Sequence, residues 1–388
     1  MMPRFSQRVA VCLAGAVAAT SFWPAAAHAQ NIQSYFPAGT GGYDRELGVT
    51  VLTRLRPLYE VPPLNVGSFQ VTSGLDQSVF YNSNFNGTPD SGTWGSRTAA
   101  SISTSSDWTR NSLTAALGFT HNQPFSFPNE SFTDWNVNLG GGYTIGDGGI
   151  QAGYSHQTYN QIGFNIGTVT SETPVRDQTD TGYIGYSANF ARFTINPSIS
   201  ASAYRFGAAT AGGATLDENF LNRNVIAGGV VTRYSLSDEG SLLLVTRGIG
   251  SNFVNPLAGQ PRQDSTGIQV LGGLDYQAKG VWRYRLLAGV ETRMFAASQY
   301  PTHTGLITEG SVIWSPTELT TLTGSISRGI EDPETPDTNG FTLTQGKLVV
   351  DHELRRNVFL QLRGAVAEAQ FLTGGGSQTD ISLGGGAT

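Results

Sequence analysis

The feature that most constrains this chain is an alternation of apolar and polar side chains that repeats in strand-length pieces. It is clearest over residues 282–294, where Trp282, Leu286 and Val290 share one parity and Arg285 and Glu291 share the other. Successive side chains of a strand point to opposite faces, so this segment is predicted to be a strand with one apolar and one charged side.

Similar segments follow one another from residue 68 to the end of the chain. The first covers residues 69–81, with Phe69, Val71 and Leu75 on the apolar side and Thr72 and Asp76 on the polar side. We count about fifteen complete strands and the beginning of a sixteenth at residues 380–388. A chain of this kind is predicted to be all-β.

The connections between these strands alternate between short and long. Tight turns are expected near residues 147, 191, 238, 279, 316 and 356. Long loops are expected at residues 122–130, 161–178, 206–221, 252–265 and 331–340. Short turns at one end and longer loops at the other are typical of outer-membrane barrels, whereas a soluble sandwich would not keep two loop classes in alternation over so many hairpins.

We therefore predict a transmembrane antiparallel up-and-down β-barrel of about 16 to 18 strands. Bacterial barrels have even strand numbers and usually end on an aromatic residue, whereas this sequence stops at residues 384–388, Gly-Gly-Gly-Ala-Thr. We expect the sequence to be truncated, with its last strands missing.

The first residues are predicted to be removed on export. Arg4 and Arg8 precede the apolar run 9–19, and Ala27-His28-Ala29 has the pattern of a cleavage site, so residues 1–29 are assigned to a signal peptide. Residues 30–67 form a proline-containing leader, either periplasmic, tucked into the lumen or a loose tail, and residues 68–388 form the barrel. This order predicts location in the bacterial cell outer membrane.

Composition excludes several classes of protein. After the signal peptide no run of 18 apolar residues exists, which excludes a helical membrane protein. Charged residues are only 13% of the chain and form no basic stripe, so nucleic acid is not expected as a partner. The only cysteine, Cys12, lies in the signal peptide, which leaves no disulfide or thiolate metal site.

No sequence pattern indicates catalysis. The chain lacks a G-x-S-x-G elbow and an H-E-x-x-H motif, and the mature histidines His121, His156, His303 and His352 are far apart. We predict a protein that is not an enzyme and needs no cofactor or metal. The acidic loop 331–337 is expected to be solvated, although it could instead bridge cations to lipopolysaccharide phosphates.

The candidate functional residues are charges of inward parity, because a charge facing lipid at the bilayer midplane costs roughly 2–4 kcal/mol. The predicted pore-lining residues are Asp275, Arg247, Arg283, Arg285, Glu291, Arg293, Lys347 and Arg363. The same parity places Asp76, Arg97, Asp134, Arg233, Glu309 and Asp351 inside. The alternative is that these charges form an internal salt-bridge network that fills the lumen.

Three short motifs carry a resemblance to a known family. They are Arg56-Pro57-Leu58-Tyr59, Gly67-Ser68-Phe69 and the strand end Tyr81-Asn82-Ser83-Asn84. Together with Ser106-Asp107-Trp108 and the segment 142–148, they resemble the beta-barrel porin type 2 family from about residue 51 to the end. The resemblance implies an outer-membrane barrel of unproven substrate, often associated with exopolysaccharide export.

Two functions follow as expectations. The first is a porin-like channel for passive passage of hydrophilic solutes or polysaccharide, polarised by the arginines of residues 283–293. The second is a non-conducting barrel, plugged by the leader, that serves as a scaffold or export partner in exopolysaccharide secretion. The expected partners are outer-membrane lipid, lipopolysaccharide, the barrel-assembly machinery and, for the second function, polysaccharide export components. The oligomeric state stays open.

Overall fold

The computed structural model describes residues 50–52, 54, 62–83, 85–86, 91–163, 171–277, 281–335, 338–356 and 358–387. The predicted signal peptide and most of the predicted leader lie outside these residues. Within them, helix is confined to the short turns η1 (Pro128–Glu130) and η2 (Asn219–Leu221). No helix in this part of the chain is long and apolar enough to cross a membrane.

The described chain is dominated by one antiparallel sheet of seventeen strands. It consists of the short β1 (Leu64–Val66) and the long strands β2 (Phe69–Asn82), β3 (Thr93–Ser106), β4 (Asn111–Pro124), β5 (Phe132–Ile145), β6 (Gly148–Gly163), β7 (Ser171–Phe190), β8 (Phe193–Arg205), β11 (Arg223–Ser235), β12 (Gly240–Phe253), β13 (Ser265–Gln277), β14 (Trp282–Phe295), β15 (His303–Thr317), β16 (Thr320–Glu331), β17 (Phe341–Arg355), β18 (Val358–Phe371) and β19 (Ser377–Ala387). A separate hairpin, β9 (Ala208–Ala211) with β10 (Ala214–Asp217), sits in the connection between β8 and β11.

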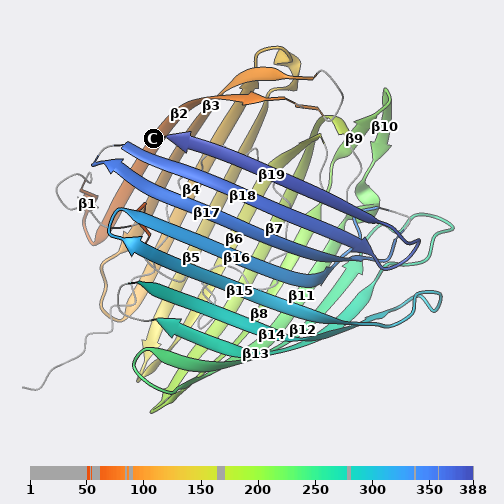
Figure 1. Cartoon of the computed structure of the whole chain (residues 1–388). Helices are drawn as coiled ribbons and strands as arrows, with labels where there is room; N and C mark the ends of the chain where they lie inside the picture. Colours follow the sequence, from red (N-terminus) through yellow and green to blue (C-terminus); the bar gives the residue numbers. More distant parts are fainter. Residues whose placement is uncertain are drawn as a thin grey trace, which may run out of the picture.

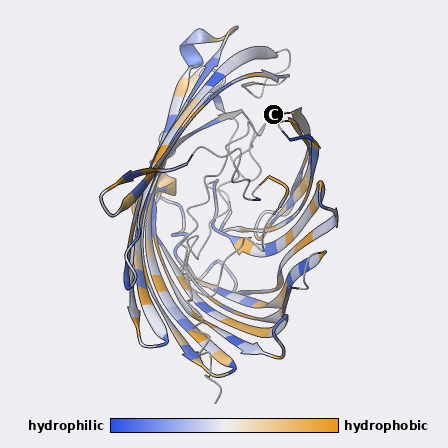
Figure 2. Cartoon of the chain, turned by 90° about the vertical axis from the view of Figure 1, so that its left-hand side faces the viewer, coloured by the Kyte–Doolittle hydropathy of each residue, from blue (hydrophilic) through white to orange (hydrophobic). Residues whose placement is uncertain are grey.

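Each long strand pairs with the next one along the chain, and β8 pairs with β11. In Figure 1 the orange-to-green strands β2–β8 stand behind the green-to-blue strands β11–β19, so the sheet curls into a barrel-like wall. No register joins β2 to β19 among the described residues, and the wall is open between them, as Figure 2 shows. β1, at the end of the predicted leader, pairs with the free side of β2.

The predicted alternation of connections is confirmed, and it divides the barrel into two rims. The short rim carries the connections 107–110, 146–147, 191–192, 236–239, 278–281, 318–319 and 356–357, and the other rim carries all the longer ones. The turn at 107–110 was not predicted, and the one expected near residue 316 lies at 318–319 because β15 continues through a bulge after Trp314.

One predicted loop is wrong. Residues 161–178 were expected to be irregular, but β6 continues to Gly163 and β7 already begins at Ser171, with Gln161 opposite Val175. This hairpin rises beyond its neighbours at the long rim. Its side chains there are polar because they have no lipid to face, so the segment reads as a loop in the sequence.

The outer face carries the apolar parity predicted from the sequence. On β14, Trp282, Leu286 and Val290 are exposed, whereas Leu287 and Glu291, one residue out of phase, are buried. The alternation of orange and blue along the strands in Figure 2 is this pattern seen over the whole wall. Exposed apolar side chains over this many strands form the lipid-facing band of a membrane barrel.

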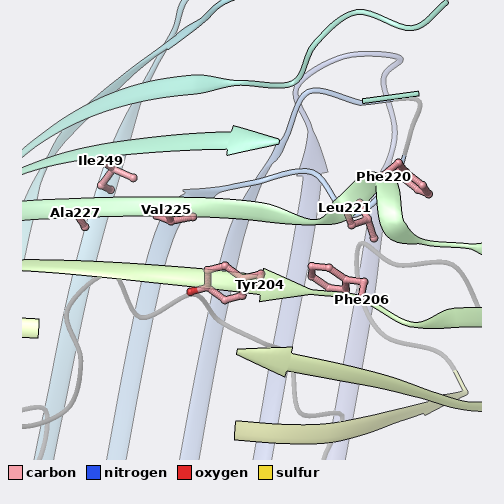
Figure 3. Packing of buried hydrophobic residues seen from close by; sticks show 7 residues of the cluster. All are labelled: Tyr204, Phe206, Phe220, Leu221, Val225, Ala227 and Ile249. Atoms are coloured by element: carbon pink, nitrogen blue, oxygen red, sulfur yellow. The ribbon is translucent and has the colours of Figure 1, made fainter. Parts of the chain in front are cut away.

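The inner face of β11–β15 is partly apolar, which the sequence analysis did not predict. Val231, Leu243, Val245, Leu271, Leu287 and Ile307 form one buried cluster there. A second buried apolar cluster lies on the inner side near the long rim. It is formed by residues in and next to β8, η2, β11 and β12 (Figure 3). These strands are apolar on both faces because a curled sheet crowds its inner side chains together and removes them from water.

Candidate pore wall

All eight predicted pore-lining residues belong to the inner face of the sheet. The registers align Arg247 with Gln269 and Glu291, and Asp275 with Arg285, across neighbouring strands. Arg293, two residues beyond Glu291 on β14, shares this face, as does Arg283 at the opposite end of the strand. Lys347 and Arg363 lie on the corresponding face of β17 and β18.

The lowest group on this wall, nearest the short rim, is centred on Asp275. One carboxylate oxygen of Asp275 lies 2.8 Å from Nη2 of Arg233 and 3.0 Å from Nη2 of Arg285. The three side chains come from β13, β11 and β14, so the carboxylate joins strands on both sides of its own. Hydrogen bonds between guanidinium and carboxylate groups are among the strongest in proteins, so this group ties the three strands together.

The middle group is a bidentate pair. Nη1 and Nη2 of Arg247 on β12 lie 2.5 Å and 3.2 Å from the two carboxylate oxygens of Glu309 on β15. Gln269 stands between this pair and the next group, because its amide donates to Glu291 at 2.9 Å and its carbonyl faces Arg247 at 3.4 Å.

The upper group is centred on Asp332, the first residue after β16. Its carboxylate lies 2.7 Å from Nη1 of Arg293 and 3.4 Å from Nε of Arg223, and Ser251 donates to it at 2.7 Å. Arg293 also binds Glu291 at 2.8 Å. Asp332 is 1% exposed, so the expectation of a solvated acidic loop is wrong for this residue.

Asp332 fixes the loop between β16 and β17 against the inner wall. From the β12–β13 connection, the Gln263 amide donates to the carbonyls of Thr335 at 3.1 Å and Thr338 at 2.6 Å. Thr338 and Asn339 are buried as well. The loop therefore folds inward at the long rim and covers the upper group of charges.

Burial raises the pKa values of carboxyl groups in the long-rim loops, and for two of them the pKa is about 7. Burial raises the pKa of Glu334 to about 7, with Arg223 opposing and Asp332 adding to the shift. Burial also raises the pKa of Glu218 to about 7, and the nearby charge of Glu334 adds to it. These two loops, one before β11 and one after β16, are thus coupled electrostatically through carboxyl groups whose pKa values are raised to about 7.

The predicted residues fall into two groups by exposure. Arg247, Asp275, Glu291 and Arg293 are buried in the three groups of ion pairs described above, which we call the ion-pair ladder. In contrast, Lys347 is exposed, and Arg283, Arg285 and Arg363 are half-buried. The buried residues thus fit the alternative, an internal salt-bridge network, and the more exposed residues fit the predicted lining role.

The water-accessible inner wall lies elsewhere, on β2–β5. Gln70, Thr72 and Asp76 of β2, Ser101 of β3 and Asn138 of β5 are exposed on the inner face of the sheet. The sequence analysis had placed Asp76 inside, but it selected only charges and passed over the uncharged residues, although their Ser, Thr, Asn and Gln content was the available signal.

A fragment of the predicted leader contacts the inner wall. The amide of Val51 donates to Oγ1 of Thr321 at 3.1 Å, and Arg54 forms an ion pair with Glu353 at 3.0 Å. Arg54 also donates to the carbonyl of Glu318 at 2.9 Å. Val51 and Arg54 are therefore anchored at the short-rim end of β16 and β17, on the inner side.

Aromatic pairs border the outer band. Trp282 stacks on Trp314 with centroids 5.2 Å apart at the short rim, and Tyr81 packs on Trp94 at 5.2 Å at the long rim. Aromatic side chains at both ends of an apolar band are the interfacial girdles of an outer-membrane barrel.

A hydrogen-bonded chain of side chains lies on the outer face of β6 and β7. Asp180 accepts from Tyr154 at 2.6 Å and lies 2.8 Å from Nδ1 of His156, whose Nε2 lies 3.2 Å from Oγ1 of Thr158. The order resembles a hydrolase triad, but Thr158 is 1% exposed and the surrounding backbone amides are used by the sheet. This hydrogen-bonded set of four side chains therefore has no accessible nucleophile. Among the described residues, no group of three or more His, Cys, Asp or Glu could hold a metal ion.

The model of the family Putative beta-barrel porin 2 matches residues 56–388. No curated protein matches.

Among solved structures, the chain is similar to the FrpB iron transporter from Neisseria meningitidis (TM-score 0.45, 10% identity, 79% of this chain and 55% of that one). It is similar to the siderophore receptor PirA from Acinetobacter baumannii (TM-score 0.45, 7% identity, 81% and 57%). It is also similar to OccAB3 from Acinetobacter baumannii (TM-score 0.40, 8% identity, 83% and 100%). The chain spans little more than half the length of the first two.

The family match confirms the resemblance seen in the sequence motifs, and with it the all-β fold and the outer-membrane location. The chain belongs to the family Putative beta-barrel porin 2, whose place is the bacterial outer membrane.

Proposed function

We propose that the protein is a channel for passive passage of hydrophilic solutes across the outer membrane. The observation that supports this best is the opposite polarity of the two faces of one wall. On β2–β5 the outer face exposes residues such as Leu75 and Leu139, while the inner face exposes Thr72, Ser101 and Asn138. A barrel that is apolar outside and wettable inside lowers the barrier for polar solutes.

The test is single-channel recording in planar bilayers with the full chain, after folding has been verified by heat-modifiable migration in gels. Stepwise conductance is expected. Folded protein that never conducts would contradict the channel.

A second function is supported by the anchoring of Val51 and Arg54. If the leader occupies the lumen, the barrel is closed at rest and serves as a scaffold or export partner, and polysaccharide is the cargo that the resemblance suggests. The Arg54–Glu353 ion pair then helps to hold the leader inside the lumen.

Arg54→Gln and deletion of residues 30–65 separate the two functions. If the leader plugs the barrel, the wild type does not conduct, and both changes raise the conductance. Under the channel reading, the wild type already conducts and Arg54→Gln leaves its unit conductance unchanged. Arg110→Gln, in a short-rim turn, is the matched control.

A further inference from the structure

The charges of the inner face are distributed unevenly around the barrel. The ladder on β11–β16 pairs each arginine with a carboxylate, and most of these side chains are buried. Fixed charges that are paired and removed from water exert little net field on a passing solute, because the opposite signs cancel within a few ångströms. The arginines of the ladder, among them Arg247 and Arg293, are thus poorly suited to select ions.

The accessible wall on β2–β5 presents a different chemistry. Its inward side chains are mainly hydroxyl and amide groups, among them Thr72, Ser101, Ser103, Thr114 and Asn138. Hydroxyls and amides both donate and accept hydrogen bonds, and they carry no charge. The oxygens of Thr72 and Ser103 lie 2.6 Å apart and remain on the exposed surface, where either can turn to a solute.

The few charges on this wall are of mixed sign. Asp76 is exposed on β2, and Arg97 is buried and interacts electrostatically with Asp76 and Asp134. This set gives the wall no uniform sign that would attract one kind of ion.

We propose that solutes move along the hydroxyl- and amide-lined wall of β2–β5, that the permeant class is uncharged polyhydroxylated solutes such as sugars and polyols, and that the ion-pair ladder is structural. This inference rests on the proposed channel function. It reverses the expectation that the arginines of β14 polarise the pore.

The test measures ion selectivity in planar bilayers with a gradient of potassium chloride. The wild type is expected to reverse near zero potential and, in proteoliposome swelling, to admit neutral sorbitol at least as fast as gluconate, an anion of similar size. Ser101→Arg should move the reversal potential toward that of chloride, and Ser101→Asp toward that of potassium. Ser101→Asn, which adds bulk without charge, is the matched control and should stay near zero. Thr72→Asp repeats the test on β2.

Glu309→Gln is the opposing test. Glu309 is the most exposed carboxylate of the ladder, with 23% of its side chain accessible, and its loss leaves Arg247 without that partner. If the ladder is structural, this variant lowers thermal stability and leaves the reversal potential unchanged. A strongly selective wild type, or a shift with Glu309→Gln and none with Ser101→Arg, would overturn the solute class while the channel stands. Absence of conductance in every folded variant would overturn the channel and this inference with it.

Discussion

At the scale of single residues, Asp332 is the side chain of the ladder that lies in a loop and not in a strand. Its carboxylate meets Arg293, Arg223 and Ser251, which come from three different strands. The sequence showed an acidic residue in a proline-containing loop, which is usually a solvated position.

Asp332→Asn is expected to destabilise the folded barrel by about 3 kcal/mol, because it removes the buried negative charge that Arg223 and Arg293 share. The measurement is the free energy of unfolding by urea in detergent or lipid. Asp238→Asn, in an exposed short-rim turn, should change it by less than about 0.5 kcal/mol. Equal effects of the two variants would show that the upper group of charges contributes nothing.

The long-rim carboxyl groups Glu218 and Glu334 predict a pH dependence. Their folded-state pKa of about 7 lies above the ordinary value for glutamate, so the folded state binds these protons more tightly than the unfolded state. Their stabilising contribution is complete below about pH 4 and is lost as the pH rises through 7. We expect protease resistance of the long-rim loops to fall between pH 5 and pH 8.

Glu334→Gln replaces a titrating carboxyl group with an amide that does not titrate. The long-rim loops of this variant should therefore lose less protease resistance over the same pH range. Glu172→Gln, in the β6–β7 hairpin, serves as a control. If wild type and Glu334→Gln follow the same curve, the two loops are not coupled through these groups.

At the scale of the elements, β13 and β14 approach each other more closely than side chains allow at two positions. A Cβ at Gly289 would lie 1.9 Å from the carbonyl oxygen of Val270, and one at Gly273 would lie 1.9 Å from that of Leu286. A contact with backbone cannot be relieved by a side-chain rotation, so these glycines set the local geometry of the hairpin.

Gly289→Ala is therefore expected to lower stability by about 1–3 kcal/mol through overpacking. Gly324→Ala, on β16, has no atom within 4 Å of the added carbon and is the matched control. Thermal loss of the heat-modifiable band measures both. A Gly289→Ala barrel as stable as wild type would mean that the two strands can separate without cost.

At the scale of the whole molecule, the apolar lipid-facing band on the outer face suits the barrel to a membrane. β14 crosses this band with Trp282 at the short rim, Leu286 near the middle and Met294 at the long rim, all exposed. The edges of the sheet at β2 and β19 are open. Backbone N–H and C=O groups that face lipid must be hydrogen-bonded, because no water is available there.

A charge placed on this face should be costly according to its depth. Leu286→Arg is expected to destabilise the barrel by about 2–4 kcal/mol and Met294→Arg by about 0–1 kcal/mol. Unfolding in phospholipid vesicles measures the difference. Equal costs at the two positions would place the bilayer elsewhere on the wall.

The sequence by itself determined the wall, its faces and its two rims. Alternation with a period of two can be read along a single segment, and the lengths of turns are local properties, so the inward parity of Arg247, Asp275 and Glu291 followed without a structure. The hairpin of β6 and β7 was mistaken for a loop because, beyond the bilayer, polar strands and loops have similar compositions.

Only the tertiary structure decided which inward charges meet water. The partners of Asp332 lie on strands far from it in sequence, and the ladder forms because curvature brings β11, β12 and β14 under the β16–β17 loop. Parity tells which face a side chain occupies, but pairing and burial on that face depend on the registers of many strands at once. The same curvature leaves the wall of Thr72 and Ser101 open to solvent, and for that reason the accessible lining was found in the structure and not in the sequence.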